Sequence, residues 1–167
     1  MKEISAGDAF SKLKPELVVF VISIDKNQKP SGLVAARFLK CSRNPPLIAV
    51  SIGKESNTHN LITTSKEFVV AVANQDLLPY IEVFGRESGS EIDKFEKTKI
   101  EKLPAKHIKS PLLKKASINF ECKLEKEIDM GSSTLFLGKV LASHINEGKK
   151  MLFNYGKGYG EYIFKEL

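Results

Sequence analysis

The chain has 167 residues, of which 42% are hydrophobic and 28% are charged, a balance typical of a soluble globular domain. Its 26 basic and 20 acidic side chains give a formal net charge of +6, which suits an anionic ligand as well as a nucleic acid. This composition excludes an intrinsically disordered chain, a collagen-like repeat and a disulfide scaffold. We therefore expect one domain over residues 1–167.

The two cysteines, Cys41 and Cys122, lie far apart and form no CxxC pair. They are too few to form a structural zinc site, so we interpret both as reduced and buried, small hydrophobic side chains. Residues 1–5 lack the apolar core of a signal peptide, and no apolar run of 18 residues occurs. We expect a cytoplasmic protein without a membrane partner.

The first half of the chain alternates apolar runs with turn residues. The β-branched run LVVFVISI predicts a buried strand, and the following DKNQKP predicts a hairpin turn. Asn74 or Asp76 can cap the last helix of this half. The predicted elements are a strand over 17–24, a turn over 25–30, an ambiguous small-residue segment over 31–41, a strand over 47–52, a short helix ending near 66, a strand over 68–73 and a helix running toward 84.

The second half begins with a polar, lysine-rich segment over residues 86–115, which predicts a long, solvated excursion across a barrel or sheet. Residues 118–125 then alternate strictly between apolar and polar, which predicts a strand with one buried and one solvated face. A turn over 131–133 leads into a strand over 134–145, where Gly138 marks a bulge or a close backbone approach. Short strands with two or three small helices favour a closed antiparallel barrel.

Motifs with a known chemistry are absent: the chain contains no GxGxxG, P-loop, HExxH or GxSxG. The three histidines, His59, His107 and His144, have no metal-ligand spacing, so we expect no metal site. The lysine-rich stretch 97–115 has no interleaved aromatic residues, so we expect no nucleic-acid partner.

One group of residues could bind an anion. Lys54, Ser56 and Thr58 stand at the start of a predicted helix, where a cation, hydroxyls and free N–H groups would converge. The alternative is a solvated lysine beside ordinary capping residues. Upstream, the small side chains of 33–36 would let a flat ligand approach the backbone, although a crowded barrel wall uses such residues too.

Eight short motifs occur in a fixed order, and from about residue 15 to 162 this order resembles the flavin reductase-like, flavoredoxin-type family of FMN-binding split-barrel proteins. The motifs are PSGLVAARF (30–38), NPPLIAVSI (44–52), NTHNLI (57–62), KEFVV (66–70), SGSEIDKF (88–95), SPLL (110–113), FEC (120–122) and GSSTLFLGKV (131–140).

The resemblance implies a mainly β fold with small α helices, a six-stranded antiparallel Greek-key split barrel. It also implies a homodimer that holds FMN at the subunit interface. The cofactor-binding residues implied are Val34, Ala35, Ala36, Arg37 and Phe38 along the isoalloxazine and Lys54, Ser56 and Thr58 near the phosphate; Asp93, Lys94, Phe95 and Tyr159 border the substrate pocket.

The implied function is an FMN-binding oxidoreductase that passes a hydride from NAD(P)H to flavin and on to free flavin, ferric iron or a partner protein. Because the cofactor carries this chemistry, we assign no catalytic side chain. The alternative is a non-enzymatic electron carrier or flavin-binding module. Family members often have Thr and Ser in place of Val34 and Ala36, and many have a histidine in place of Ser133. That histidine has been linked to nicotinamide use.

Overall fold

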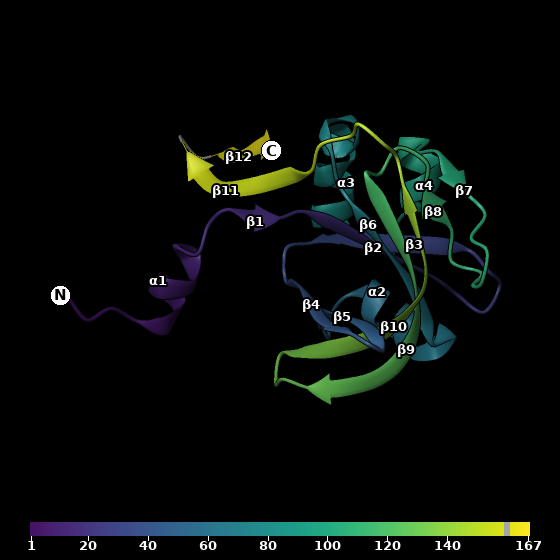
Figure 1. The fold of residues 1–167 in the computed structure, drawn as a ribbon, viewed down its shortest axis with the longest axis horizontal. Coiled ribbons are helices and arrows are strands. Elements are labelled where there is room, and N and C mark those ends of the chain that lie inside the picture. The colour runs from purple at the N-terminus through teal and green to yellow at the C-terminus, as the bar shows by residue number, and fades with distance from the viewer. Residues whose placement is uncertain (159–160) are drawn as a thin grey trace.

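A computed structural model describes residues 1–158 and 161–167 (Figure 1). Its main sheet has seven antiparallel strands in the order β3-β2-β6-β9-β10-β5-β4. The strands are β2 (Val19–Ile24), β3 (Pro30–Ala35), β4 (Phe38–Arg43), β5 (Pro46–Gly53), β6 (Glu67–Val72), β9 (Ile118–Asp129) and β10 (Ser133–Ile145).

The two edge strands of this sheet, β3 and β4, are consecutive in the chain and joined only by Ala36 and Arg37. The N–H of Ser51 in β5 donates to the carbonyl of Arg37 at 3.1 Å. The sheet must therefore curl until its edges approach each other, which confirms the antiparallel barrel. The segment over 31–41, which was ambiguous in the sequence, contributes to both β3 and β4.

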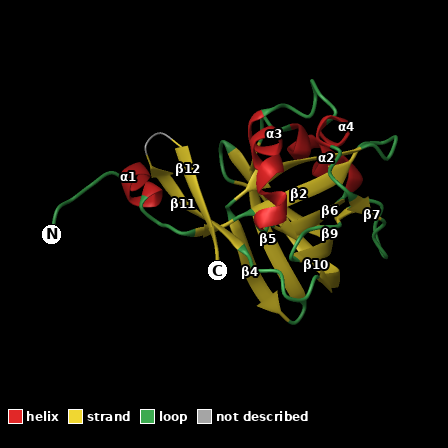
Figure 2. Ribbon diagram, turned by 90° about the horizontal axis from the view of Figure 1, so that it is seen from above, coloured by secondary structure: helices red, strands yellow, loops and turns green. Residues whose placement is uncertain are grey.

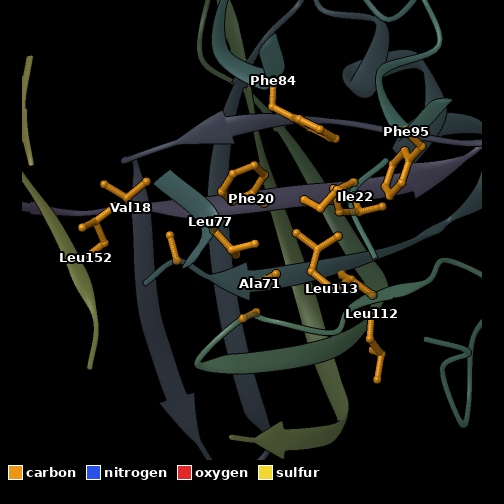
Figure 3. Packing of buried hydrophobic residues seen from close by; sticks show 14 residues of the cluster. Val18, Phe20, Ile22, Ala71, Leu77, Phe84, Phe95, Leu112, Leu113 and Leu152 are labelled. Carbon is orange, nitrogen blue, oxygen red and sulfur yellow. The ribbon is translucent and has the colours of Figure 1, made fainter. Parts of the chain in front are cut away.

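Two apolar clusters lie on the two faces of β2 and β6, which explains why both strands read as continuous apolar runs. Inside the barrel, Phe68, Cys122 and Phe136 are fully buried. The prediction of a buried cysteine is therefore confirmed for Cys122, but it is wrong for Cys41, which is exposed. Figure 3 shows the outer cluster, in which Phe20 of β2 packs edge-on against Phe84 with ring centroids 5.3 Å apart.

The two helices that the sequence predicts, one ending near 66 and one running toward 84, are present as α2 and as η1 with α3, whereas α1 and α4 were not predicted. Ser56 caps α2, because its Oγ accepts the N–H of Thr58 at 3.1 Å. Asn74 caps the following 3₁₀ helix by accepting the N–H of Asp76 at 3.0 Å. The helices are α1 (Ala6–Ser11), α2 (Asn57–Ser65), η1 (Gln75–Tyr80), α3 (Ile81–Arg86) and α4 (Lys94–Thr98). In the described part of the chain, no helix has the length and apolar character needed to cross a membrane.

The prediction that the polar residues of the strand at 118–125 are solvated is wrong at two positions. Asn119 is 5% exposed and Glu121 is fully buried. The excursion over 86–115 causes this: it forms the two-residue strands β7 (Lys102–Leu103) and β8 (Leu112–Leu113) and folds back over β9.

Gly138 was predicted to mark a bulge or a close backbone approach, and the structure shows both. The register of β10 against β9 shifts between Leu137 and Gly138. A Cβ at Gly138 would lie 2.5 Å from Cζ of Phe68 and 3.0 Å from Cβ of Cys122. The backbone of β10 therefore lies directly against the barrel core.

A second, three-stranded sheet was not predicted from the sequence. It pairs β1 (Glu16–Leu17) with β11 (Leu152–Gly158) and β12 (Glu161–Glu166), and we call it the C-terminal ribbon. Figure 2 shows this ribbon and α1 projecting away from the barrel.

Candidate functional site

The larger cavity has a volume of about 630 Å³ and lies between β3, α3 and the C-terminal ribbon. This volume falls within the range of roughly 300–1,000 Å³ that is usual for cofactor sites. Its lining includes Val34, Ala35 and Ala36 from the end of β3, Ile81, Gly85 and Arg86 from α3, and Asn154 and Phe164 from the ribbon.

The wall formed by residues 34–36 presents small side chains and an unpaired strand edge. β3 pairs with β2 alone, so one side of its backbone lies outside the sheet ladder. On the opposite wall, a Cβ at Gly85 would lie 3.9 Å from Cβ of Val34, so the two walls are close there. A flat ligand could lie against this edge and hydrogen-bond to its backbone.

The mouth of the cavity carries a cation. The guanidinium of Arg86 pairs with Glu82 at 3.1 Å, and both side chains are largely exposed. Exposed pairs of this kind contribute little to stability. An anionic group on a ligand could therefore replace Glu82 as the partner of Arg86.

The predicted anion-binding residues lie at the junction of β5 and α2. Lys54 Nζ contacts both carboxylate oxygens of Asp129 at 2.9 Å, and this hydrogen bond holds the pKa of Asp129 below its usual range. Ser56 acts as the helix cap, in agreement with the capping alternative for that residue. Thr58 is 2% exposed.

These three residues do not line the larger cavity as far as the structure describes it, but they are connected to it through β5. Ser51, which bonds to Arg37 at the β3–β4 corner, precedes Lys54 by three residues. Three residues of extended strand span about 10 Å. An elongated ligand with an anionic end could reach both regions.

Polar side chains near the start of β10 adjoin this junction, and the sequence did not reveal their proximity. Ser51 Oγ donates to Ser133 Oγ at 3.2 Å, and a ring nitrogen of His59, Nε2, lies 2.8 Å from Thr134 Oγ1. The other nitrogen, Nδ1, is buried without a hydrogen-bond partner among the described residues. The pairing of β5 with β10 brings Ser51 close to Ser133, and the packing of α2 against β10 brings His59 to Thr134.

The remaining predicted residues are dispersed. Arg37 is exposed, and Phe38 stacks on Phe120 with ring centroids 6.5 Å apart. Tyr159 lies outside the described residues.

The segment 93–95 lies apart from the larger cavity in the described part of the chain. Asp93 caps α4, pairs with Lys29 at 3.1 Å and lines a separate depression of about 200 Å³. The hydrogen bond from the Glu96 N–H is the main cause of its lowered pKa. Lys94 and Phe95 are buried, and Phe95 packs against Phe84.

A comparison with known protein families classifies the chain. A family model described as "Flavin reductase like domain" matches residues 13–162. The chain belongs to this family. It is similar to the ferric-chelate reductase (NAD(P)H) of Archaeoglobus fulgidus, at 28% identity over 87% of this chain and 84% of the relative. An uncharacterized protein of the same organism is 36% identical over 72% of this chain and 67% of its own length.

Solved structures share the fold. The FMN-binding protein from Thermus thermophilus, solved with p-hydroxybenzaldehyde, is 25% identical with a TM-score of 0.84, covering 98% of this chain and 95% of that one. The NADH:FAD oxidoreductase SgcE6 of Streptomyces globisporus C-1027 has a TM-score of 0.83 at 21% identity, with 98% and 96% coverage.

Some relatives are longer than the matched region. The match spans 60% of the high molecular weight rubredoxin of Moorella thermoacetica and 58% of the uncharacterized protein PYRAB12460 of Pyrococcus abyssi.

Proposed function

We propose that this protein is a flavin reductase-type oxidoreductase that binds FMN beside β3 and passes reducing equivalents from NAD(P)H to an acceptor. The acceptor is free flavin, ferric iron or a partner protein. The observation that carries the proposal is the 630 Å³ cavity against the edge of β3, in a chain that belongs to the flavin reductase-like family.

The residues at the cavity suit the flavin ring. In this proposal the ring lies along residues 34–38 and takes hydrogen bonds from the outer backbone edge of β3. The small side chains of Ala35 and Ala36 permit this approach, while Ile81 and Phe164 add apolar surface to the lining of the cavity.

The junction of β5 and α2 suits the phosphate. In this proposal Lys54 supplies the cation and Thr58 a hydroxyl. The first turn of α2 adds little, because the N–H groups of Thr58 and His59 already donate to Ser56 at 3.1 and 3.0 Å. Ser56 contributes less, because its Oγ already accepts the Thr58 N–H. Exchanging Asp129 for a phosphate as the partner of Lys54 costs little, since Lys54 and Asp129 are 38% and 73% exposed.

When bound, the flavin supplies the hydride-transfer chemistry. The chain's own part is to hold the ring flat against β3, to hold the phosphate and to keep water out of the cavity. None of these tasks needs an acid or base, so we assign no catalytic side chain.

We further propose a cytoplasmic homodimer. The cavity lies at the rim of the barrel and is open to solvent, so a second subunit can close it.

The experiment is flavin uptake. The purified protein, incubated with micromolar FMN, should show a flavin absorbance spectrum that bleaches with dithionite. A colourless protein that takes up no FMN would contradict the proposal.

A second candidate is a flavin-binding electron carrier without nicotinamide turnover. Ser133 favours it, because this hydroxyl is already bonded to Ser51 and stands where many family members have a histidine. Anaerobic mixing of the FMN-loaded protein with NADH and with NADPH separates the two. Bleaching by either nucleotide indicates the reductase, and bleaching by dithionite alone indicates the carrier.

A further inference from the structure

Lys94 is buried behind the walls of the larger cavity, and its ammonium group joins them. The residue is 3% exposed. Its Nζ donates to the carbonyl of Gly32 in β3 at 2.9 Å and to the carbonyl of Phe84 in α3 at 3.0 Å. Gly32 is two residues before Val34, and Phe84 directly precedes Gly85.

Both carbonyls need a donor from outside their own element. β3 is an edge strand, so carbonyls on its outer side have no neighbouring strand to bond with. Phe84 lies in the last turn of α3, where helix carbonyls lack intrahelical partners and a cation is favourable. One ammonium group satisfies a strand edge and a helix end together.

Burying this charge is costly. Within the described residues, no carboxylate lies within ion-pair distance of Lys94, and its ammonium lies 5.6 Å from the centre of the Phe84 ring. Burial lowers the pKa of Lys94 to about 8, while the nearby Glu87, itself paired with Lys97, acts in the opposite direction. A methionine would fill similar space without this cost, so the value of a lysine here lies in its donors.

We propose that Lys94 is a positioning residue that fixes the two walls of the flavin cavity, β3 and α3, at the separation the flavin ring requires. This inference rests on the proposed function. Without the two hydrogen bonds of Lys94, the β3 edge and the end of α3 can shift relative to each other, and displacements below 1 Å weaken the fit of a flat ring. The phosphate site, held by β5 and α2, does not depend on Lys94.

The test compares two ligands and three variants. Lys94→Met removes both donors, Lys94→Gln retains an amide donor, and Lys97→Met is the control on an exposed lysine of the same helix. FMN and riboflavin are titrated against each protein by fluorescence quenching, with far-UV circular dichroism and thermal unfolding to confirm folding.

We expect Lys94→Met to bind both ligands about 10- to 100-fold more weakly. Lys94→Gln should recover part of this loss, and Lys97→Met should match the wild type. A folded Lys94→Met protein with unchanged affinity for both ligands would overturn the proposal. A loss for FMN alone would also overturn it, because it would place Lys94 at the phosphate. If Lys94→Met does not fold, Lys94→Gln carries the same comparison against wild type.

A wild type that binds no flavin would refute the proposed function. The role of Lys94 in holding β3 and α3 together would then be tested without ligand. Amide hydrogen exchange at residues 32–35 and 84–86 should be faster in Lys94→Met than in Lys97→Met. Equal exchange rates in the two variants at both segments would show that Lys94 does not hold β3 and α3 together.

Discussion

Lys54 is the residue on which the phosphate assignment depends, and its present partner is the carboxylate of Asp129 at the exposed end of β9. A charge-assisted hydrogen bond contributes roughly 1.5–3 kcal/mol, so Lys54→Ala should weaken FMN binding about 10- to 150-fold. Thr58→Val preserves shape and leaves the backbone donors, so it should cost about tenfold. Riboflavin lacks the phosphate, and its affinity should hardly change in either variant. Titration of both ligands measures this.

Lys66 offers a matched control, because it is exposed and pairs with Glu127 as Lys54 pairs with Asp129. Lys66→Met should leave the affinity for both ligands unchanged. Equal losses of FMN and riboflavin affinity in Lys54→Ala would mean that Lys54 shapes the fold and does not bind the phosphate.

The buried ammonium of Lys94 should also leave a signature in the pH dependence of stability. Burial lowers its pKa to about 8 in the folded state, against about 10.4 in an unfolded chain. Between these values the unfolded state binds more protons, so the free energy of unfolding rises with pH. The cost of burying the charge is fully present below pH 8. Relative to Lys94→Met, the wild type should gain up to about 3 kcal/mol between pH 7.5 and 10.5.

Urea unfolding of both proteins across this pH range measures the difference, and effects of the other lysines cancel between them. A constant difference between wild type and Lys94→Met would show that the ammonium is not desolvated.

The sequence could indicate Lys54, Ser56 and Thr58 because they are neighbours at a helix start. It could not indicate the role of Lys94, whose acceptors are backbone carbonyls 62 and 10 residues away. Backbone groups carry no sequence signature, so a side chain that serves them looks like any lysine in a polar stretch. The contact of His59 in α2 with Thr134 in β10 was hidden for a similar reason, because only the folded chain packs this helix against that strand.

At the scale of elements, β10 depends on the missing side chain of Gly138. A methyl group there would overlap the ring of Phe68 and press on Cys122. Neither residue can move easily, because both are fully buried. Gly138→Ala should therefore destabilise the protein by about 1–3 kcal/mol, as overpacked cores do. Denaturant unfolding measures it, with Gly53→Ala as the control, since a Cβ there meets nothing within 4 Å. Equal stability of the two variants would contradict the close approach.

Loop 104–110, part of the lysine-rich excursion, is held down by carboxylates from the sheet. Glu121 accepts the N–H groups of Lys106 and His107 at 2.8 and 2.7 Å and contacts His144 at 2.7 Å. Glu67 accepts the N–H groups of Lys109 and Ser110, each at 2.7 Å. Burial of Glu121 acts to raise its pKa, but these hydrogen bonds outweigh burial and leave the pKa below its usual value.

Glu121→Gln replaces an acceptor oxygen by an NH₂ group facing a backbone N–H, so it should cost about 1–3 kcal/mol at pH 7. Because the folded pKa of Glu121 is lowered, its stabilising contribution is present above the unfolded pKa and is lost as pH falls through the folded one. The stability difference between wild type and Glu121→Gln should therefore shrink below about pH 4. Urea unfolding at pH 7 and pH 3.5 checks this, and a difference that widens in acid would contradict it.

At the scale of the whole molecule, the barrel was predictable because alternation, β-branched runs and turn residues are local signals. The C-terminal ribbon was not, because β11 pairs with β1 across more than a hundred residues. The cavity shares this limit: its walls come from β3, α3 and the ribbon, three elements that only the folded chain brings together. Residues 34–36, which lie within the family motifs, form part of one wall, while Arg86 and Asn154 lie outside those motifs.

The projecting ribbon and α1 give the last prediction, the homodimer. Both leave large apolar side chains exposed, among them Phe10 at 68%, Leu13 at 66% and Leu167 at 64%. Large apolar side chains exposed on a projecting arm are typical of an association surface, and a second copy would bury them while closing the open cavity. The interface should exceed about 2,000 Å². Light scattering should give about 37 kDa, twice the 18.6 kDa of one chain.

The double variant Phe10→Asp, Leu13→Asp should shift the protein toward monomer and weaken FMN binding, whereas Leu103→Asp on the distant β7 should do neither (Figure 1). A monomeric wild type with FMN bound would refute the dimer.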